Sequence, residues 1–363
     1  MRKGLCTLAA ISLVAVGGLA ACGTEETPGG GDDASPKVGV ILPDSASAVR
    51  WETADRKYLE EAFQAAGIEY DIQNAQGSTQ TFQTIADQMI TSGVTILMIV
   101  NLDSGSGAAV LQKARDAGVK TIDYDRLTLN GGAVYYVSFN NVSVGELQGE
   151  GLVKCLEEKG VEKPVVAYLN GSPTDNNATL FKEGYDSVLA PKFEDGSYTK
   201  GPEESVPNWD GTQAVTLFEQ MFTAANGKID GVLSANDTLG NAAISVLTRN
   251  GLNGQVPVTG QDASVAGLQN ILKGDQCMTV YKAIKAEADA AAELAIALAK
   301  GETPEGLTTV RDTEANRDVP SRLEVPVAIF KDNVKDVVDD GFVTKAELCT
   351  GEYEALCAEA GIS

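Results

Sequence analysis

Residues 37–67 read KVGVILPDSASAVRWETADRKYLEEAFQAAG, and this stretch decides the fold. Its β-branched run KVGVILP is typical of a buried strand, and RKYLEEAFQAAG places apolar residues at helical spacing and ends on Gly67. The same order of strand, turn and helix continues through IEYDIQNA, TQTFQTIADQMITSG, VTILMIVN, GAAVLQKARDAG and VKTIDYDR. Strands and helices alternating at this spacing predict right-handed βαβ units and a parallel sheet covered on both faces.

A second series of the same kind begins after AVYYVSFNN at residues 133–141. It includes VGELQGEGLVKCLEEKG, VVAYLNG, IDGVLSAND, VPVTGQD and CMTVYKA, while the long helix AEADAAAELAIALAKG at residues 286–301 is assigned to the first series. The sequence therefore predicts an α/β protein with two doubly wound parallel-sheet domains. In such sheets, ligands bind at the carboxyl ends of the strands.

The composition limits the possible functions. The chain has 363 residues, 43% of them hydrophobic, which is enough for a large core and about two domains. Its formal net charge of -23 argues against nucleic acid and against anionic lipid headgroups as partners. The sequence has no histidine, so the commonest general base and the commonest metal ligand are missing. We expect a protein that is not an enzyme and that binds neither cofactor nor metal.

The N-terminus has the form of an export signal. Arg2 and Lys3 precede an apolar segment that is too short to anchor in a bilayer and ends in small residues. Residues 19–22, LAAC, are similar to a bacterial lipobox, which predicts a lipoprotein signal peptide over 1–21 and lipidation of Cys22. The alternative is an ordinary signal peptide that leaves Cys22 as a spare thiol.

Residues 22–36 have the composition of a flexible tether, with Gly, Pro, Ser and acidic residues and no apolar periodicity. We therefore expect an extracytoplasmic protein that is lipid-anchored to the outer face of the bacterial cell membrane.

Four cysteines remain once the signal peptide and Cys22 are set aside. In an exported protein they suggest two disulfides, although the sequence alone allows three pairings. Cys349 and Cys357 are the easiest to bridge locally, and Cys155 with Cys277 then follows by elimination. Buried free thiols are the alternative for this second pair.

Polar and aromatic side chains gather where the predicted strands end. These positions contain no nucleophile beside a base, no metal-ligand cluster and no phosphate-binding glycine loop. Carboxylates, amides, Arg and Lys exchange hydrogen bonds with sugar hydroxyls, and flat aromatic rings stack on the C–H faces of a pyranose. Both tryptophans of the chain are in this set, which predicts a sugar ring held between them. The candidate residues are Arg50, Trp51, Asp125, Arg126, Asp175, Asn177, Trp209, Asn236, Asp262 and Lys282.

Each of these residues also has a plainer explanation. Asp and Asn at strand–helix junctions are frequent helix N-caps, which is the alternative for Asp175 and Asn236. Arg126 beside Asp125 could form a surface ion pair of little consequence, and Trp209 could be a packing residue. Capping does not explain two arginines, a lysine and both tryptophans at equivalent strand ends, so we favour a binding site.

Several motifs of the chain are specific, among them RW at 50–51, YVSFNN, GSPTDNNA, KIDGVLSAND, GQDA and DVPSRL. Through these motifs the sequence resembles the periplasmic sugar-binding proteins of ABC importers, in the ribose-binding group, over almost the whole chain from residue 37 onward. The resemblance implies the periplasmic binding protein type I fold, with the ten candidate residues lining a monosaccharide pocket and the tryptophans on opposite faces of the ring. It also implies a monomer that delivers D-xylose to an ABC importer permease, with glucose, arabinose and galactose as alternative ligands.

The resemblance further implies a three-segment hinge, with crossings near residues 138–141, 281–283 and 323–326. The N-terminal lobe would combine residues 37–138 with 283–324, and the C-terminal lobe residues 139–281 with 325–345. Residues 346–363 would form a cysteine-containing extension. The ligand would favour the closed state of the hinge through the contacts that closure adds.

The chain departs from the family pattern at three places. The helix after Trp51 is one residue longer, which could shift this tryptophan; the segment FEDGSYTKGPEESVP at 193–207 varies; and the extension at 346–363 is additional.

Two other functions are alternatives to a receptor for an ABC importer. A receptor of the same fold that signals to a chemoreceptor or sensor kinase would have the same pocket and differ only in its partner. A glycosidase needs a pair of carboxyl groups, one of them protonated, whereas arginines beside the candidate aspartates should keep these ionised.

Overall fold

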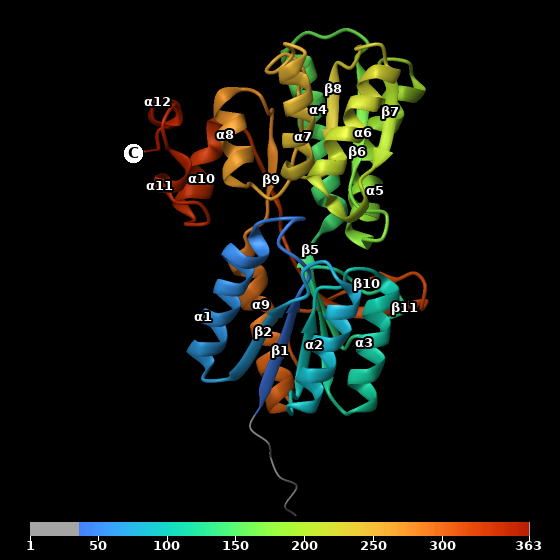
Figure 1. The fold of residues 1–363 in the computed structure, drawn as a ribbon, viewed down its shortest axis with the longest axis vertical. Coiled ribbons are helices and arrows are strands. Elements are labelled where there is room, and N and C mark those ends of the chain that lie inside the picture. Colours follow the sequence, from blue (N-terminus) through green and yellow to red (C-terminus); the bar gives the residue numbers. More distant parts are fainter. Residues whose placement is uncertain (1–35, 363) are drawn as a thin grey trace, which may run out of the picture. The chain divides into compact units, whose positions relative to one another are not determined.

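The computed structural model describes residues 36–362, which fold into two α/β lobes, each with its own sheet (Figure 1). The predicted signal peptide, the predicted lipidation site Cys22 and all of the predicted tether except Pro36 lie outside the described residues. Between residues 36 and 362, no helix is both long enough and apolar enough to cross a membrane.

The first lobe, called the N-lobe below, is built on a seven-stranded sheet in the order β10-β11-β5-β4-β3-β1-β2. Neighbouring strands are parallel except for the antiparallel pair β10 and β11 at one edge. The strands are β1 (Lys37–Leu42), β2 (Glu69–Asn74), β3 (Ile96–Ile99), β4 (Lys120–Tyr124), β5 (Tyr135–Phe139), β10 (Thr308–Asp312) and β11 (Arg317–Glu324). The helices of this lobe are α1 (Arg56–Ala66), α2 (Thr79–Thr91), α3 (Ser104–Asp116) and α9 (Ile284–Lys300).

Strand β1 shows how the sequence produces the layers of the N-lobe. Val38, Val40 and Leu42 pack in one core with α1 and α9, whereas Ile41 packs in another core with α2 and α3. The strand is thus apolar on both faces, as expected for a parallel sheet covered by helices on both sides. Helix α9 therefore belongs to the N-lobe, as the sequence predicts.

The second lobe, the C-lobe, contains a parallel sheet in the order β7-β6-β8 and an antiparallel pair, β12-β9. Its strands are β6 (Val165–Asn170), β7 (Thr199–Ser205), β8 (Gly231–Ser234), β9 (Thr279–Tyr281) and β12 (Val327–Ile329). Its helices are α4 (Asn141–Glu158), α5 (Asn176–Glu194), α6 (Gly211–Ala224), α7 (Asp237–Arg249), α8 (Val265–Lys273), α10 (Val334–Asp339), α11 (Lys345–Leu348) and α12 (Tyr353–Glu359). Short 3-10 turns lie at Pro207–Trp209 and Lys331–Asn333.

The chain passes from one lobe to the other at three places. The first passage lies between β5 and α4, the second between β9 and α9, and the third between β11 and β12. Each lobe is consequently made of segments that are distant in the sequence.

The segment at residues 256–262, which the sequence predicts as a strand, is extended but forms only isolated bridges with its neighbours. The reason is a side chain that takes over backbone hydrogen bonds. Thr259 Oγ1 accepts a hydrogen bond from the Ser234 backbone N–H at 2.9 Å and donates one to the Ser234 carbonyl at 3.1 Å. The regular ladder with β8 ends there.

Four strands are not predicted by the sequence pattern, namely β7, β10, β11 and β12. Strand β7 has the sequence TKGPEES, which shows no apolar alternation because the strand lies at an edge of its sheet and is mostly exposed. Pro202 is tolerated within it because an edge strand has one side without a partner. Strand β10 is also a largely exposed edge strand, paired only with β11.

The C-terminal segment packs onto the C-lobe. Leu348, Cys357 and Ile362 are buried in one cluster with residues of α8, and Gln269 Nε2 donates a hydrogen bond to the Leu348 carbonyl at 3.0 Å. Residues 346–362 therefore cover α8 and are part of the lobe.

The four remaining cysteines lie in two pairs. The Cα atoms of Cys349 and Cys357 are 5.8 Å apart, and those of Cys155 and Cys277 are 6.4 Å apart.

Candidate binding site

The structure brings all ten sequence-predicted residues to the lining of one cavity, at the carboxyl ends of strands from both lobes. The cavity has a volume of about 30 Å³ and is partly open to solvent. Four further residues, which the sequence reasoning missed, complete the lining: Ser47, Ala48, Phe181 and Gln261.

Arg50 is the centre of the N-lobe side of this cavity, and three buried carboxyl groups hold it. Its Nε and Nη2 donate to both oxygens of Asp55 at 2.8 and 2.7 Å. Nη2 also donates to Glu287 Oε2 at 2.8 Å, and Nη1 donates to Asp125 Oδ2 at 3.0 Å. The guanidinium is 3% exposed, so its orientation is fixed before any ligand arrives.

A five-residue π-helix, Trp51–Asp55, explains how Arg50 and Asp55 meet. Arg50 is the residue before this helix and Asp55 is its last residue. In a π-helix, residues five apart lie on the same face, whereas an α-helix would separate them. This turn brings Asp55 beneath the guanidinium of Arg50.

Trp51 is a buried platform beneath two cations. Its indole Nε1 donates to Ser47 Oγ at 3.1 Å, which fixes the ring. The guanidinium carbons of Arg50 and Arg126 lie 4.4 and 5.5 Å from the ring centroid, within the range of cation–π attraction. The ring is thus shared with both arginines of the site.

Asp125 is ionised because of the cations around it. Burial alone would raise its pKa, but Lys282, Arg50 and Arg126 lower the pKa of Asp125 to about 2. This carboxylate can therefore accept hydrogen bonds from hydroxyl groups throughout the neutral pH range.

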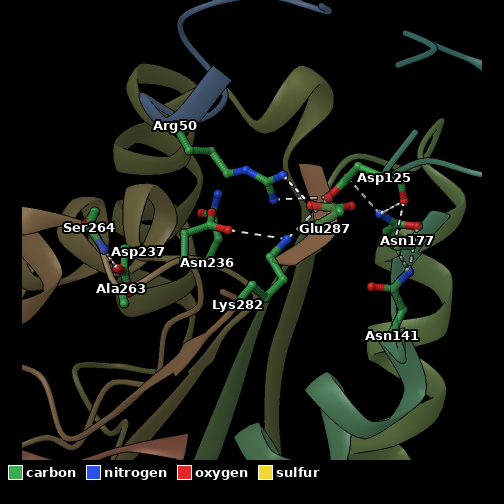
Figure 2. Close-up of polar contacts among 12 residues, drawn as sticks. Arg50, Asp125, Asn141, Asn177, Asn236, Asp237, Ala263, Ser264, Lys282 and Glu287 are labelled. Atoms are coloured by element: carbon green, nitrogen blue, oxygen red, sulfur yellow. Dashed lines mark hydrogen bonds and ion pairs between the residues drawn. The ribbon is translucent and has the colours of Figure 1, made fainter. Parts of the chain in front are cut away.

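Lys282 stands between the carboxylates of the two lobes. Its Nζ lies 3.5 Å from Asp125 Oδ2 and 3.4 Å from Asp262 Oδ1, and it follows β9 in the second passage between the lobes (Figure 2). Lys282 lines the cavity between these two carboxylates. A ligand hydroxyl could replace either carboxylate as the hydrogen-bond partner of the Lys282 ammonium group.

Asp175 lies on the C-lobe side, where it caps α5. Its Oδ1 accepts a hydrogen bond from the Asn177 backbone N–H at 2.9 Å. Its Oδ2 accepts from the Trp209 indole at 3.1 Å and lies 2.9 Å from Arg126 Nε in an ion pair. The capping alternative is thus correct for Asp175, yet the second oxygen remains directed at the cavity.

Asn236 repeats this arrangement at the start of α7. Its Oδ1 accepts from the Leu239 backbone N–H at 3.0 Å, while its Nδ2 lies 3.4 Å from the Ser47 carbonyl of the N-lobe. The same side chain therefore caps a helix with its oxygen and presents donors to the cavity with its nitrogen.

Asn177 joins the lobes from inside α5. Its Nδ2 donates to the backbone carbonyl and to Oδ1 of Asp125 at 3.0 and 3.1 Å, and its Oδ1 accepts from Asn141 Nδ2 at 2.9 Å (Figure 2). Arg126, which is 7% exposed and pairs with Asp175, makes a second link of this kind. The surface ion pair considered for Arg126 is therefore wrong, because the side chain is buried at the site.

Three lining residues have left-handed backbone conformations that side chains other than glycine rarely adopt. The φ angles are 61° for Asp125, 56° for Trp209 and 97° for Asp262, and Ala263 follows with 48°. Such conformations persist only where the surroundings enforce them, and they cluster at functional sites.

Asp237 is the residue that enforces the loop of Asp262. Its carboxyl group accepts hydrogen bonds from the Ser264 N–H and hydroxyl at 2.8 and 3.0 Å, and from Gln276 Nε2 and Thr279 Oγ1 at 2.8 Å each (Figure 2). Burial raises the pKa of Asp237 to about 6. The buried carboxyl group ties the loop to β9 and so directs Asp262 to the cavity.

Trp209 has both roles considered for it. It packs against Phe181 with ring centroids 6.4 Å apart at an interplanar angle of 66°, and it also lines the cavity. Gly171 makes this position possible, because a side chain there would overlap the six-membered ring of the indole.

Asp55 and Glu287 are two further residues of the site that the sequence does not predict. Both are completely buried under Arg50. Glu287 had one available signal, an acidic residue among alanines on the apolar side of its helix. Among residues 36–362, the structure has no group of three His, Cys, Asp or Glu residues that could hold a metal.

Comparison with known proteins gives a consistent result. The family model described as periplasmic binding protein domain matches residues 38–303. The D-xylose-binding periplasmic protein of Escherichia coli (strain K12) is 36% identical over 313 residues, covering 86% of this chain and 92% of that protein. The multiple sugar-binding periplasmic receptor ChvE of Rhizobium radiobacter is 35% identical, covering 85% of this chain and 91% of the receptor.

Among solved structures, a carbohydrate transporter solute binding protein from Chloroflexus aurantiacus in complex with D-glucose matches with a TM-score of 0.78 and 30% identity. The match covers 86% of this chain and 98% of that chain.

Proposed function

The chain belongs to the periplasmic binding protein family, and from this premise we propose that it is an extracytoplasmic receptor that captures a monosaccharide and delivers it to an ABC importer. Its fold is the type I fold of this family, as the motifs of the sequence imply. The family relatives are solute-binding proteins and not enzymes, which agrees with the expectation from the sequence.

One observation carries the proposal: both tryptophans and nine charged or amide residues from two lobes line one small cavity. Each sugar hydroxyl can both donate and accept a hydrogen bond. Asp125, Asp175 and Asp262 would accept hydrogen bonds from the hydroxyl groups, and the cationic and amide groups would donate hydrogen bonds to the hydroxyl oxygens. Trp51 and Trp209 would contact the C–H faces of the ring.

The ligand proposed first is D-xylose, because the relative from Escherichia coli is named for that sugar. A relative named as a multiple sugar-binding receptor and a similar structure in complex with D-glucose support a second possibility, another aldose such as glucose, arabinose or galactose.

The mechanism proposed is closure of a three-segment hinge. The lobes would be residues 37–138 with 283–324 and residues 139–281 with 325–345, followed by the extension at 346–363. The positions of the three chain passages support these boundaries. Ligand docked on one lobe would recruit the groups of the other, and these added contacts would favour the closed state.

The remaining expectations are part of the same proposal. Cys22 would carry the lipid anchor, and the protein would act as a monomer. Cys349 with Cys357 and Cys155 with Cys277 would form disulfides, which their Cα separations of 5.8 and 6.4 Å support. Counting thiols in the unfolded chain with and without reductant tests the two disulfides.

Titration calorimetry with the purified chain tests the function. D-xylose, D-glucose, L-arabinose, D-galactose and D-ribose are the ligands, and Trp209→Ala and Asp262→Ala are the site variants. Binding of D-xylose that both variants abolish is the expected result. Binding of only another aldose would refute the xylose assignment, and no binding of any of the five would refute the monosaccharide receptor.

A further inference from the structure

Glu287, on α9, is a completely buried carboxyl group that the proposed binding chemistry does not use. Its Oε2 accepts a hydrogen bond from Arg50 Nη2 at 2.8 Å. Its Oε1 is also buried and has no hydrogen-bond partner among residues 36–362. A carboxylate with one bare oxygen in the interior is costly, because an ionised group needs donors to replace water.

The carboxylates of Asp125 and Asp55 make the ionisation of Glu287 still less favourable, and the cations that favour it, Arg50 and Lys282, are shared with other carboxylates. Arg50 already pairs with Asp55 and Asp125, and Lys282 is divided between Asp125 and Asp262. The titratable and charged groups that surround Glu287 are Arg50, Asp55, Tyr124, Asp125, Tyr136 and Lys282. The Tyr124 hydroxyl donates its hydrogen bond to Asp55 Oδ1 at 2.7 Å, so it is not available as a donor to Glu287.

Protonation of Glu287 removes the unfavourable buried charge. Its burial, followed by the charge of Asp125, raises the pKa of Glu287 well above its usual range. The neutral acid can still accept from Arg50 through Oε2, and burying a hydroxyl at Oε1 costs much less than burying a charge.

We propose that Glu287 is a positioning residue that acts as a neutral carboxylic acid, holding Arg50 in place for the ligand, and that ligand affinity falls when it loses its proton. In the ionised form, Glu287 would attract Arg50 and Lys282 towards α9 and away from the cavity (Figure 2). The inference depends on the proposed function, since the affinity concerned is that for a monosaccharide.

The test compares the wild type with Glu287→Gln and Glu287→Leu in calorimetry with D-xylose and D-glucose, at about pH 6 and about pH 9. The wild type should bind several-fold more weakly at the higher pH. Gln is neutral and still offers an acceptor to Arg50, so Glu287→Gln should match the wild type at the lower pH and show no such change. Leu offers no acceptor to a charged donor, so Glu287→Leu should lose about tenfold or more in affinity at both pH values.

The matched control is Glu293→Gln, an exposed acid on the same helix, which should leave affinity and its pH dependence unchanged. Circular dichroism and thermal melting establish that each variant is folded. If Glu287→Gln binds as poorly as Glu287→Leu, the negative charge is what matters and the proposal is overturned. A wild-type affinity that stays constant between about pH 6 and about pH 9, although infrared spectroscopy shows that Glu287 has lost its proton at the higher pH, also overturns it.

A second measurement does not depend on a ligand. The infrared difference spectrum of wild type minus Glu287→Gln at neutral pH should contain the carbonyl band of a protonated carboxyl group, and its absence would contradict the proposal. A wild type that shows this band but binds none of the five sugars would refute the proposed function while leaving the neutral state of Glu287 established.

Discussion

The two sides of the cavity are positioned in different ways. On the N-lobe side, Arg50 is fixed by hydrogen bonds to the carboxyl groups of Asp55, Asp125 and Glu287, all of them buried. On the C-lobe side, Asp175 and Asn236 are fixed as caps of α5 and α7. A binding surface can thus be held rigid by buried charged groups or by hydrogen bonds to the backbone. Substitution and pH should affect the stability of the charged side more strongly than that of the capped side.

The largest effect should come from removing the centre of the ionic side. Arg50→Met leaves three buried carboxyl groups without their cation, so we expect a loss of about 3–5 kcal/mol in the free energy of unfolding, together with loss of sugar binding. Urea unfolding and calorimetry measure the two effects. Arg56→Met is the control, because Arg56 pairs with the partly exposed Glu52 and should contribute only about 1 kcal/mol or less. Equal effects of the two substitutions would contradict an ionic framework.

Asp123 is a buried carboxyl group of the N-lobe that has no hydrogen bond from Arg50. Burial raises the pKa of Asp123 from 3.8 to about 7, although it lies two residues before Asp125. The folded protein then keeps a proton that the unfolded chain releases, so the contribution of Asp123 to stability should fall as the pH rises from about 4 to about 7.

Asp123→Asn removes this dependence. The difference in unfolding free energy between variant and wild type should change by about 3 kcal/mol across that range, measured by urea unfolding at several pH values. Parallel stability curves for the two proteins would show that Asp123 titrates alike in both states.

A smaller effect is expected on the C-lobe side from Asp237→Ala. It removes the acceptor for donors of Ser264, Gln276 and Thr279, so we expect a loss of about 2–3 kcal/mol in stability and weaker sugar binding through the Asp262 loop. Asp210→Ala is the control, because Asp210 is an exposed cap of α6 whose loss should cost about 1 kcal/mol. Unchanged affinity in Asp237→Ala would mean that the loop holds its position without this carboxyl group.

The smallest of these effects is expected from Gly171→Ala. The added methyl group overlaps the Trp209 ring and displaces it together with its hydrogen bond to Asp175, so sugar affinity should fall by about tenfold. Calorimetry measures the change, and Gly105→Ala on α3 is a control remote from the cavity. Retained affinity would show that the position of the Trp209 ring is not critical.

The sequence predicts the ten lining residues because chemistry and strand ends coincide in them. It predicts the paired sheets for the same reason, since apolar strands and amphipathic helices alternate with little interruption. Strand β7 escapes prediction because an exposed edge strand has no apolar side to reveal it.

What the sequence does not predict depends on contacts between distant segments. Glu287 lies 237 residues after Arg50, so the pair is created by packing of α9 beside α1 and has no local pattern. The left-handed backbone of Asp125, Trp209 and Asp262 is likewise imposed by the surroundings, because these residue types do not by themselves require it.

The double use of the helix caps has a consequence for the way sugar preference can evolve. Asp175 and Asn236 cannot be exchanged for residues suited to another sugar without uncapping α5 or α7. Ala48, Phe181 and Gln261 line the same cavity and cap no helix. A lineage that adapts to a new sugar can therefore vary these three positions without uncapping a helix, provided that Phe181 keeps its packing against Trp209, while the capping positions stay under selection for folding.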